Sequence, residues 1–272
     1  MRWRPPGGVL GELVASARAD SAARRRRRPE LAPQAGLSGS PGRFRRALSD
    51  HSSPGFPLIC EVKRASPSAG RIRAEVDAAA VARDYARAGA RCLSVLTEGR
   101  RFGGSLEDLR AARNAVALPI LRKDFIVDRY MVCEAAEYGA DCVLLIAAAV
   151  DPTALVELAE TAENLGLDVL LELIYPRDLE ALELRDWPLV GINARDLETL
   201  AMDQSRFSAL APLARKPGRI LVAESGIETA EDIERVKRDG ADAALVGEAL
   251  MRREDPGSLI RALVAASGTK TS

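Results

Sequence analysis

Several short apolar runs of this chain lead into ionisable side chains that could transfer protons. The first run leads into Glu61 and Lys63, a later run leads into Lys123, and a third carries Glu172. When a lysine and a carboxylate are buried together, burial and their mutual charge shift their pKa values, and such groups act as acids and bases near neutral pH. The single histidine, His51, stands in a Ser/Pro-rich stretch, so lysines and carboxylates must carry any acid–base chemistry.

Later runs lead into a second set of polar groups and glycines, several of which suit a phosphorylated ligand. These groups are Asn193, Arg195, Glu224, Ser225, Gly226, Gly247 and Glu248. Glycine backbone N–H groups at the start of a helix bind phosphate, and a nearby cation such as Arg195 or Lys63 neutralises its charge. The two late glycines therefore favour a phosphorylated small-molecule substrate. Taken singly, each charged group could instead solvate a rim or form a structural ion pair.

The alternation of side chains along a strand sorts some of these groups. With a period of two residues, Ile59, Glu61 and Lys63 lie on one face, which we expect to be the interior of a barrel. An ion pair alone is the other interpretation of Glu61 and Lys63. In the segment Arg122-Lys123-Asp124, the same alternation points Lys123 away from both of its neighbours.

Eight short apolar runs alternate with helical patterns from residue 57 onward. The runs are Leu58–Val62, Cys92–Leu96, Pro119–Leu121, Cys142–Ile146, Val169–Leu173, Leu189–Ile192, Ile220–Val222 and Ala243–Val246. Amphipathic helical candidates include Val76–Ala88, Leu106–Val116, Pro152–Leu165, Ala230–Val236 and Leu259–Ala266. Several of the helical patterns end at a glycine of the kind that terminates helices, namely Gly89, Gly139, Gly166 or Gly240.

This alternation predicts an α/β fold, a (β/α)8 TIM barrel with an N-terminal helical extension, with helices between its eight strands. A barrel also explains why the chemical groups stand at the ends of the runs, because its functional groups gather at the C-terminal ends of the strands. A doubly wound open sheet is the second choice of fold. The absence of a Gly-x-Gly-x-x-Gly loop after the first run counts against it.

The first part of the chain differs from the rest in charge. Residues 1–50 contain eleven arginines and four acidic residues, and we expect residues 1–56 to form the helical extension and residues 57–272 the barrel. Apolar spacing predicts a helix over Val9–Ala23 and a shorter one over Arg43–Leu48. The run Arg24–Arg28 before Pro29 fits a solvated helix end, where the helix dipole favours cations, better than a nucleic-acid or targeting patch.

Composition narrows the classes of protein. With 39 basic and 39 acidic residues and 47% hydrophobic residues, the chain is neither a polyelectrolyte nor disordered. Its longest apolar run, Cys142–Val150, is too short to span a bilayer, and the start of the chain, with Arg2 and Arg4, has no signal-peptide pattern. We therefore expect a cytoplasmic protein with no membrane partner. Its four cysteines have no disulfide or metal-site spacing.

The chain resembles the indole-3-glycerol phosphate synthase family. The resemblance runs through Glu61–Ser68, Leu93–Glu98 with Phe102–Ser105, Leu121–Ile126, Gly139–Ile146, Gly191–Leu197, Ala223–Ile227 and Leu245–Glu248. It covers essentially the whole predicted barrel in the correct order. It implies decarboxylating and dehydrating ring closure of 1-(o-carboxyphenylamino)-1-deoxyribulose 5-phosphate in tryptophan biosynthesis, with no metal, no cofactor and no nucleic-acid partner.

The resemblance also implies roles for individual residues. Lys123 would be the general acid at the substrate's ketone oxygen, Glu172 and Glu61 would move protons, and Lys63 would pair with the substrate carboxylate. Asn193 and Ser225 would orient the substrate. The implied substrate- or phosphate-binding residues are Ser66, Phe102, Phe125, Arg195, Glu224, Gly226, Gly247 and Glu248, with the two phenylalanines beside the anthranilate ring. A monomer or a weak homo-oligomer is expected.

Some positions depart from the family pattern. Leu173-Ile174 replaces a common Val-His, the segment Tyr130–Ala136 lacks the usual Gln and Arg, and Ala194 and Asp196 replace common asparagines. These departures fit changes outside the reacting groups, or a paralogue in a specialised pathway. The other function classes are a sugar-phosphate isomerase, a Schiff-base aldolase using Lys123, and a nucleic-acid binder using the arginine run.

Overall fold

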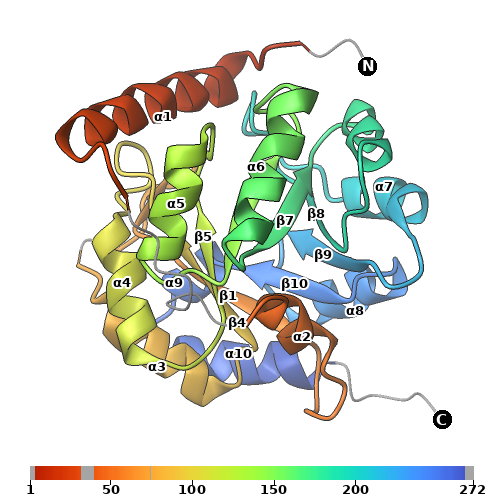
Figure 1. Ribbon diagram of the computed structural model, residues 1–272. Coiled ribbons are helices and arrows are strands. Elements are labelled where there is room, and N and C mark those ends of the chain that lie inside the picture. The colour runs from red at the N-terminus through yellow and green to blue at the C-terminus, as the bar shows by residue number, and fades with distance from the viewer. Residues whose placement is uncertain (1–3, 32–39, 74, 267–272) are drawn as a thin grey trace.

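In the computed structural model of this chain, eight parallel strands close into a barrel (Figure 1). The strands follow the order β1, β10, β9, β8, β7, β6, β5 and β4, and β1 pairs with both β4 and β10. The structure describes residues 4–31, 40–73 and 75–266. The predicted TIM barrel is confirmed, and the open doubly wound sheet is wrong. Arg2, one of the two arginines named in the prediction that the chain has no signal-peptide pattern, lies outside the described residues.

The bounds of the elements follow the predicted runs closely. The strands are β1 Leu58–Val62, β2 Ala65–Ser66, β3 Gly70–Arg71, β4 Cys92–Leu96, β5 Ile120–Lys123, β6 Cys142–Ile146, β7 Asp168–Leu173, β8 Leu189–Asn193, β9 Ile220–Glu224 and β10 Ala243–Val246. The α-helices are α1 Gly8–Arg27, α2 Arg43–Ser49, α3 Ala78–Ala88, α4 Leu106–Ala115, α5 Arg129–Glu137, α6 Pro152–Asn164, α7 Arg206–Ala214, α8 Ala230–Arg238, α9 Glu248–Met251 and α10 Pro256–Ala265. A 3-10 helix, η1, covers Pro176–Glu183.

Three strands extend further toward the C-terminal end of the barrel than their apolar runs. β5, β8 and β9 continue to Lys123, Asn193 and Glu224. Two of these runs stop at a polar residue, Arg122 or Asn193, whereas the backbone pairing of a parallel strand continues past it. The polar groups of interest are therefore held by the barrel ladder itself.

Short polar residues begin the barrel helices as expected for N-caps. Asp77, Ser105, Asp128 and Asp151 each accept a hydrogen bond from a backbone N–H in the first turn of the helix that follows. The connection between β7 and β8 does not contain the α-helix that we predicted. It contains η1, where Trp187 Nε1 donates a 2.8 Å hydrogen bond to the Ala181 carbonyl and holds the segment in a tight turn.

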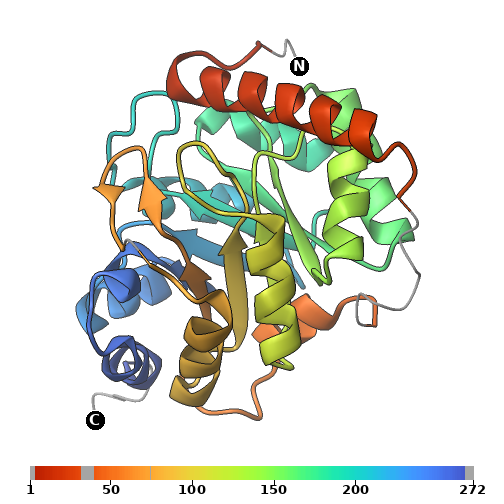
Figure 2. The ribbon, with the colours of Figure 1, turned by 90° about the vertical axis from the view of Figure 1, so that its left-hand side faces the viewer.

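Two helices precede the barrel and lie at opposite ends of it (Figures 1 and 2). Helix α1 crosses the end at which β1 and β4 terminate. Helix α2 packs at the other end, where Phe44 is fully buried and two arginines bind buried aspartates, Arg43 at 2.7 Å from Asp141 and Arg45 at 2.6 Å from Asp168. Both predicted helices of the extension are therefore present.

The arginine run is only partly the solvated helix end that we predicted. Helix α1 continues to Arg27, and Arg25, Arg26 and Arg27 are exposed. Arg24 and Arg28, however, form ion pairs with two acidic residues of α5. The prediction missed these pairs because their partners lie more than a hundred residues away in the chain. Among the described helices, none has the length and apolarity needed to cross a bilayer.

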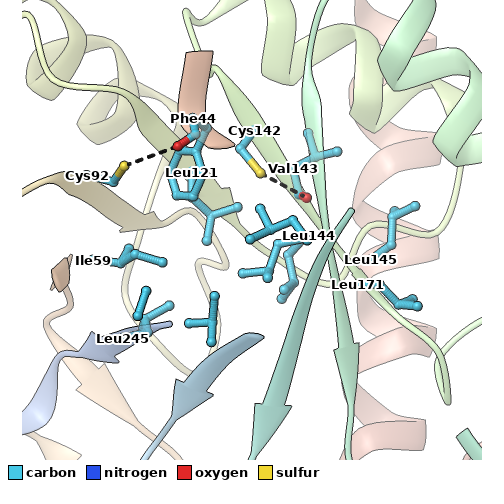
Figure 3. Packing of buried hydrophobic residues seen from close by; sticks show 14 of the residues in the cluster. Phe44, Ile59, Cys92, Leu121, Cys142, Val143, Leu144, Leu145, Leu171 and Leu245 are labelled. Carbon is cyan, nitrogen blue, oxygen red and sulfur yellow. Dashed lines mark hydrogen bonds between the residues drawn. The ribbon is translucent and has the colours of Figure 1, made fainter. Parts of the chain in front are cut away.

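Aliphatic side chains of the strands fill the core (Figure 3). Ile59, Leu144 and Leu245 belong to one buried cluster, together with Phe44 of α2. The cysteines behave as small hydrophobic groups. All four are free thiols; Cys60, Cys92 and Cys142 are buried, and Cys133 is half-buried.

Candidate active site

A pocket of about 160 Å³ opens at the C-terminal ends of the strands, on the side of the barrel covered by α1. Of the residues predicted to form the site, those that line it are Glu61, Lys63, Ser66, Phe102, Lys123, Phe125, Asn193, Arg195, Glu224, Ser225, Gly226, Gly247 and Glu248. The remaining one, Glu172, is fully buried and contacts Lys123. The barrel therefore brings together the whole predicted set.

Lys123 stands among carboxylates inside this pocket. Its Nζ lies 3.1 Å from Oε2 of Glu172 and 3.5 Å from Oε2 of Glu224. Burial by itself lowers the pKa of Lys123, but the carboxylates of Glu172, Glu224 and Glu61 outweigh it, so that this pKa is raised. Lys123 is therefore a cation at neutral pH, and its N–H bonds point among acidic groups.

Glu224 is the carboxyl group of this cluster with the least support for a negative charge. Its Oε1 is buried and accepts no hydrogen bond from the described residues. Burial and the nearby Glu172 carboxylate raise the pKa of Glu224 well above its usual range, by more than Lys123 lowers it. Glu224 therefore holds a proton more readily than a solvent-exposed glutamate does.

Two glycines make room for buried carboxylates. A Cβ atom on Gly191 would lie 1.9 Å from Oε1 of Glu224, and one on Gly247 would lie 2.4 Å from Oε1 of Glu61. A glycine inside a strand often marks such a close approach. The position of Glu224 therefore depends on the missing side chain at residue 191 of β8.

Glu61 and Lys63 form the direct ion pair that the alternation of β1 allowed. Nζ of Lys63 lies 2.9 Å from Oε1 of Glu61, and Ser94 Oγ lies 3.4 Å from Oε2 of the same carboxylate. Both side chains also line the pocket. The ion pair therefore leaves both side chains available to a ligand. Glu61 and Lys63 can form a structural ion pair and also take part in acid–base chemistry.

A hydrogen-bonded chain links Glu172 to the β9 end. Asn193 Nδ2 donates to Oε1 of Glu172 at 3.2 Å, and Ser225 Oγ donates to Oδ1 of Asn193 at 2.8 Å. The backbone N–H of Arg195 donates to the same Oδ1 at 2.9 Å. Because the amide of Asn193 is held on both sides, it fixes one oxygen of Glu172 and leaves the other for Lys123.

The far side of the pocket has the features expected for phosphate. Ser225 and Gly226 both have left-handed backbone conformations, with φ of 66° and 71°, and they form a turn after β9. Arg195 reaches the same side, where its Nη1 donates to the Leu200 carbonyl at 3.2 Å and its Nη2 lies 3.9 Å from Glu248. This side of the pocket therefore combines a cation with a glycine turn.

Apolar side chains close another wall of the pocket. The rings of Phe102 and Phe125 have centroids 6.1 Å apart and an interplanar angle of 40°. Leu13 of α1 and Leu200 also line the pocket. Such a wall suits a planar ring better than a charged group.

Sequence analysis missed several pocket residues. They are Leu13, Pro67, Ser68, Asp124, Leu197, Leu200 and Met202, among others. Leu13 had a usable signal, because an apolar stripe on a helix must pack on something. Pro67 and Ser68 lie between β2 and β3, two strands too short to be recognised by periodicity. Among the described residues, no group of three or more His, Cys, Asp or Glu is arranged to hold a metal ion.

Most of this chain is similar in sequence to proteins of one known family. The family model described as indole-3-glycerol phosphate synthase matches residues 10–263. Among similar proteins, an indole-3-glycerol phosphate synthase of Streptomyces griseus is 45% identical over 267 residues and covers 95% of each chain. One of Rhodospirillum rubrum is 43% identical over 260 residues, covering 94% of this chain and 98% of its own.

Solved structures with low sequence identity share the fold. A 3-hexulose-6-phosphate synthase matches with a TM-score of 0.61 at 18% identity, covering 78% of this chain and 99% of its own. Tryptophan synthase subunit alpha from Legionella pneumophila matches with a TM-score of 0.58 at 15% identity, covering 82% of this chain and 97% of its own. At these identities the likeness concerns the barrel alone.

Proposed function

This chain belongs to the indole-3-glycerol phosphate synthase family, and from that premise we propose how the side chains of its barrel mouth carry out the reaction. The protein is a carboxy-lyase of tryptophan biosynthesis that acts on a phosphorylated substrate. Membership of this family sets aside the isomerase and aldolase alternatives. The substrate is 1-(o-carboxyphenylamino)-1-deoxyribulose 5-phosphate, which the enzyme closes to an indole ring with loss of CO₂ and water.

Lys123 is the general acid of ring closure. When the aromatic carbon that carries the carboxylate attacks the ketone carbon, negative charge develops on the ketone oxygen, and the Lys123 ammonium donates a proton to it. Loss of CO₂ returns the electron pair to the ring. The observation that carries this assignment is the cationic Nζ of Lys123 inside the pocket, 3.1 Å from Glu172 and 3.5 Å from Glu224.

Glu172 and Glu61 move the protons of the later steps. Dehydration takes a proton from the carbon beside the ring nitrogen and gives a proton to the departing hydroxyl group. Glu172 accepts the proton from this carbon and returns it through its contact to Lys123, which has given its own proton to the ketone oxygen, and the Asn193 amide keeps this carboxylate in place. Glu61, paired with Lys63, shuttles protons on the β1 side of the pocket.

Lys63 and the phenylalanines bind the two ends of the anthranilate group. The Lys63 ammonium pairs with the substrate carboxylate, and Phe102 and Phe125 contact the ring. Once CO₂ has left, this carboxylate no longer exists. Lys63 therefore contributes to binding of the substrate, whereas Lys123 contributes to the transition state.

Arg195 and the glycine turns bind phosphate. Arg195 supplies charge, and Ser66, Gly226 and Gly247 supply hydrogen bonds, while Ser225 and Asn193 orient the substrate hydroxyl groups. Glu248 acts through Arg195, because a carboxylate accepts hydrogen bonds but repels phosphate. When it is protonated, Glu224 donates a hydrogen bond to the substrate or to Glu172, and its raised pKa supports this role.

A comparison of one lysine variant and one glutamate variant tests these roles. Lys63→Met should raise KM more than it lowers kcat, because it removes substrate binding. Glu172→Gln should lower kcat by about 100-fold or more with little change in KM, which is the range expected for loss of a proton-transfer group. The assay follows the rise of indole fluorescence from the carboxyphenylamino-deoxyribulose phosphate. A large kcat loss in Lys63→Met with unchanged KM would contradict the division of roles.

We also propose a cellular location, an oligomeric state and a division of the chain into domains. The chain acts in the cytoplasm as a monomer or weak homo-oligomer, and residues 1–56 form a helical extension to the barrel domain of residues 57–272. Sedimentation velocity tests the oligomeric state, and a tight oligomer at micromolar concentration would overturn this proposal.

A further inference from the structure

A chain of ion pairs connects helix α1 to the outer side of β5, the strand that ends at Lys123. Arg24 of α1 binds Glu134 of α5 with both ends of its guanidinium, Nε to Oε1 at 2.6 Å and Nη2 to Oε2 at 3.0 Å. The Glu134 side chain is only 4% exposed. A bidentate pair of this kind fixes orientation as well as charge.

Glu134 passes this contact on to Arg122, which is fully buried on β5. Nη1 of Arg122 lies 3.4 Å from Oε2 of Glu134 and donates to the Met131 carbonyl at 2.6 Å. Its Nε donates to Thr97 Oγ1 at 3.1 Å. Since every nitrogen of its guanidinium has a partner, Arg122 has a single well-defined position between β4, β5 and α5.

Asp124 completes the chain next to the reacting groups. Its Oδ2 lies 3.1 Å from Nη2 of Arg122 and also accepts from Thr97 Oγ1, while its Oδ1 accepts from the backbone N–H of Phe125 at 2.9 Å. On the other side of this residue, the Lys123 carbonyl accepts from the backbone N–H of Thr97 at 3.1 Å. The network therefore holds the backbone on both sides of the Lys123–Phe125 segment.

The network contains two cations, Arg24 and Arg122, and two anions, Glu134 and Asp124. Removal of one cation leaves an unbalanced buried charge, and the remaining groups must rearrange to find partners. Arg24 is the member on the separate helix, 110 residues from Glu134 in the chain. Its loss therefore alters the network without changing β5 itself.

We propose that Arg24 is a positioning residue of this enzyme, which acts through Glu134, Arg122 and Asp124 to hold Lys123 and Phe125 in their catalytic geometry. This inference rests on the proposed role of Lys123. It gives α1 a function in turnover beyond covering the pocket. This role also explains why Arg24, the first residue of the arginine run, is half-buried although the run resembles a solvated helix end.

The chain offers a matched control in the next pair along the same two helices. Arg28 Nη1 lies 2.5 Å from Oε1 of Glu137, and this pair joins the end of α1 to α5; among the hydrogen bonds and ion pairs of the described residues, none links either side chain to β5. Arg28→Met therefore removes an ion pair between the same helices and leaves the network intact. A merely structural role of Arg24 would make the two methionine variants alike.

The experiment measures kcat, KM and thermal unfolding of Arg24→Met, Arg24→Lys and Arg28→Met in the full chain, with the indole fluorescence assay at a temperature where each is folded. We expect Arg24→Met to lower kcat by about 5- to 100-fold, because displacement of a reacting group by about 1 Å has effects of this size. Arg28→Met should stay within about twofold of wild type. Arg24→Lys keeps the positive charge but loses the two-pronged contact of the guanidinium with Glu134, so its kcat should be intermediate.

Equal kcat values in Arg24→Met and Arg28→Met would overturn the proposal, as would a change confined to KM. Where Arg24→Met does not fold, Glu134→Gln replaces it, because this variant keeps the shape of the side chain and removes the charge that joins the two arginines. Lys123→Met separates this inference from the role of Lys123. If Lys123→Met retains turnover, the assignment of the acid fails, and a kcat loss in Arg24→Met then supports positioning of the pocket alone.

Discussion

A methyl group added at Gly191 tests whether Glu224 must stay in place. In Gly191→Ala the new Cβ would lie 3.0 Å from Cδ and only 1.9 Å from Oε1 of Glu224, and two non-bonded atoms cannot keep a separation of 1.9 Å. Glu224 must therefore move, and it must leave its position 3.5 Å from Lys123. The alanine has no backbone strain of its own, because Gly191 is not among the residues with positive φ.

The size of the effect follows from this overlap. Forcing an extra carbon into a packed interior destabilises a protein by about 1–3 kcal/mol. Displacement of Glu224 from the Lys123 cluster should also lower kcat by about 10- to 100-fold, as expected when a group around the reacting atoms shifts by about 1 Å. Stability is measured by urea unfolding and activity by the indole fluorescence assay.

Two further variants make this test specific. Gly99→Ala is the control, because a Cβ at exposed Gly99 meets nothing closer than a carbonyl oxygen at 3.5 Å, and it should behave as wild type. Adding Glu224→Asp to Gly191→Ala shortens the acid and should recover part of the lost stability. Wild-type turnover and stability in Gly191→Ala would refute the reasoning.

Three other predictions concern charge, packing and thiol reactivity. Because the pKa of Glu224 is raised in the folded state, the stability that this group contributes is full below its unfolded pKa and is lost as pH rises through the raised value. The unfolding temperature should therefore decline less steeply on the alkaline side in Glu224→Gln than in wild type. Parallel curves for the two proteins would contradict this. Phe44→Ala should lower the free energy of unfolding by about 3–5 kcal/mol in urea titrations, because this ring is fully buried between α2 and the barrel. A loss below about 1 kcal/mol would show that α2 does not stabilise the barrel. Burial raises the pKa of all four thiols, and three of them lie in the core, so in native protein a thiol reagent should modify only half-buried Cys133, and slowly. Rapid labelling of the buried thiols, detected by mass spectrometry, would contradict the packing. These buried thiols are Cys60, Cys92 and Cys142.

Local patterns in the sequence predicted the barrel because each strand and each helix is encoded within a few residues. The run Leu58–Val62 became β1 with the predicted bounds, and the glycines that end helices adopt the left-handed conformation, for example Gly89 with φ of 104°. Strand ends converge at one mouth in any barrel. Strand order therefore predicted that Lys123 and Glu172 lie close together, but it did not predict the distance between them.

Contacts between distant segments could not be predicted in the same way. The apolar stripe of α1 predicted that the helix packs on something, but nothing in it says that Leu13 reaches the pocket or that Arg24 meets Glu134. The raised pKa of Glu224 likewise depends on burial by several strands, and its position depends on a missing side chain in β8. Such properties arise from packing among many elements, and no short motif encodes them.

The most direct test of the account is the turnover of Lys123→Met. The purified variant is given the carboxyphenylamino-deoxyribulose phosphate without metal, indole fluorescence is followed, and substrate binding is measured separately by thermal stabilisation. The account predicts that turnover is lost while the folded variant still binds the substrate through its phosphate and ring contacts. Turnover at the wild-type rate in Lys123→Met would contradict the central claim that this lysine is the acid of ring closure.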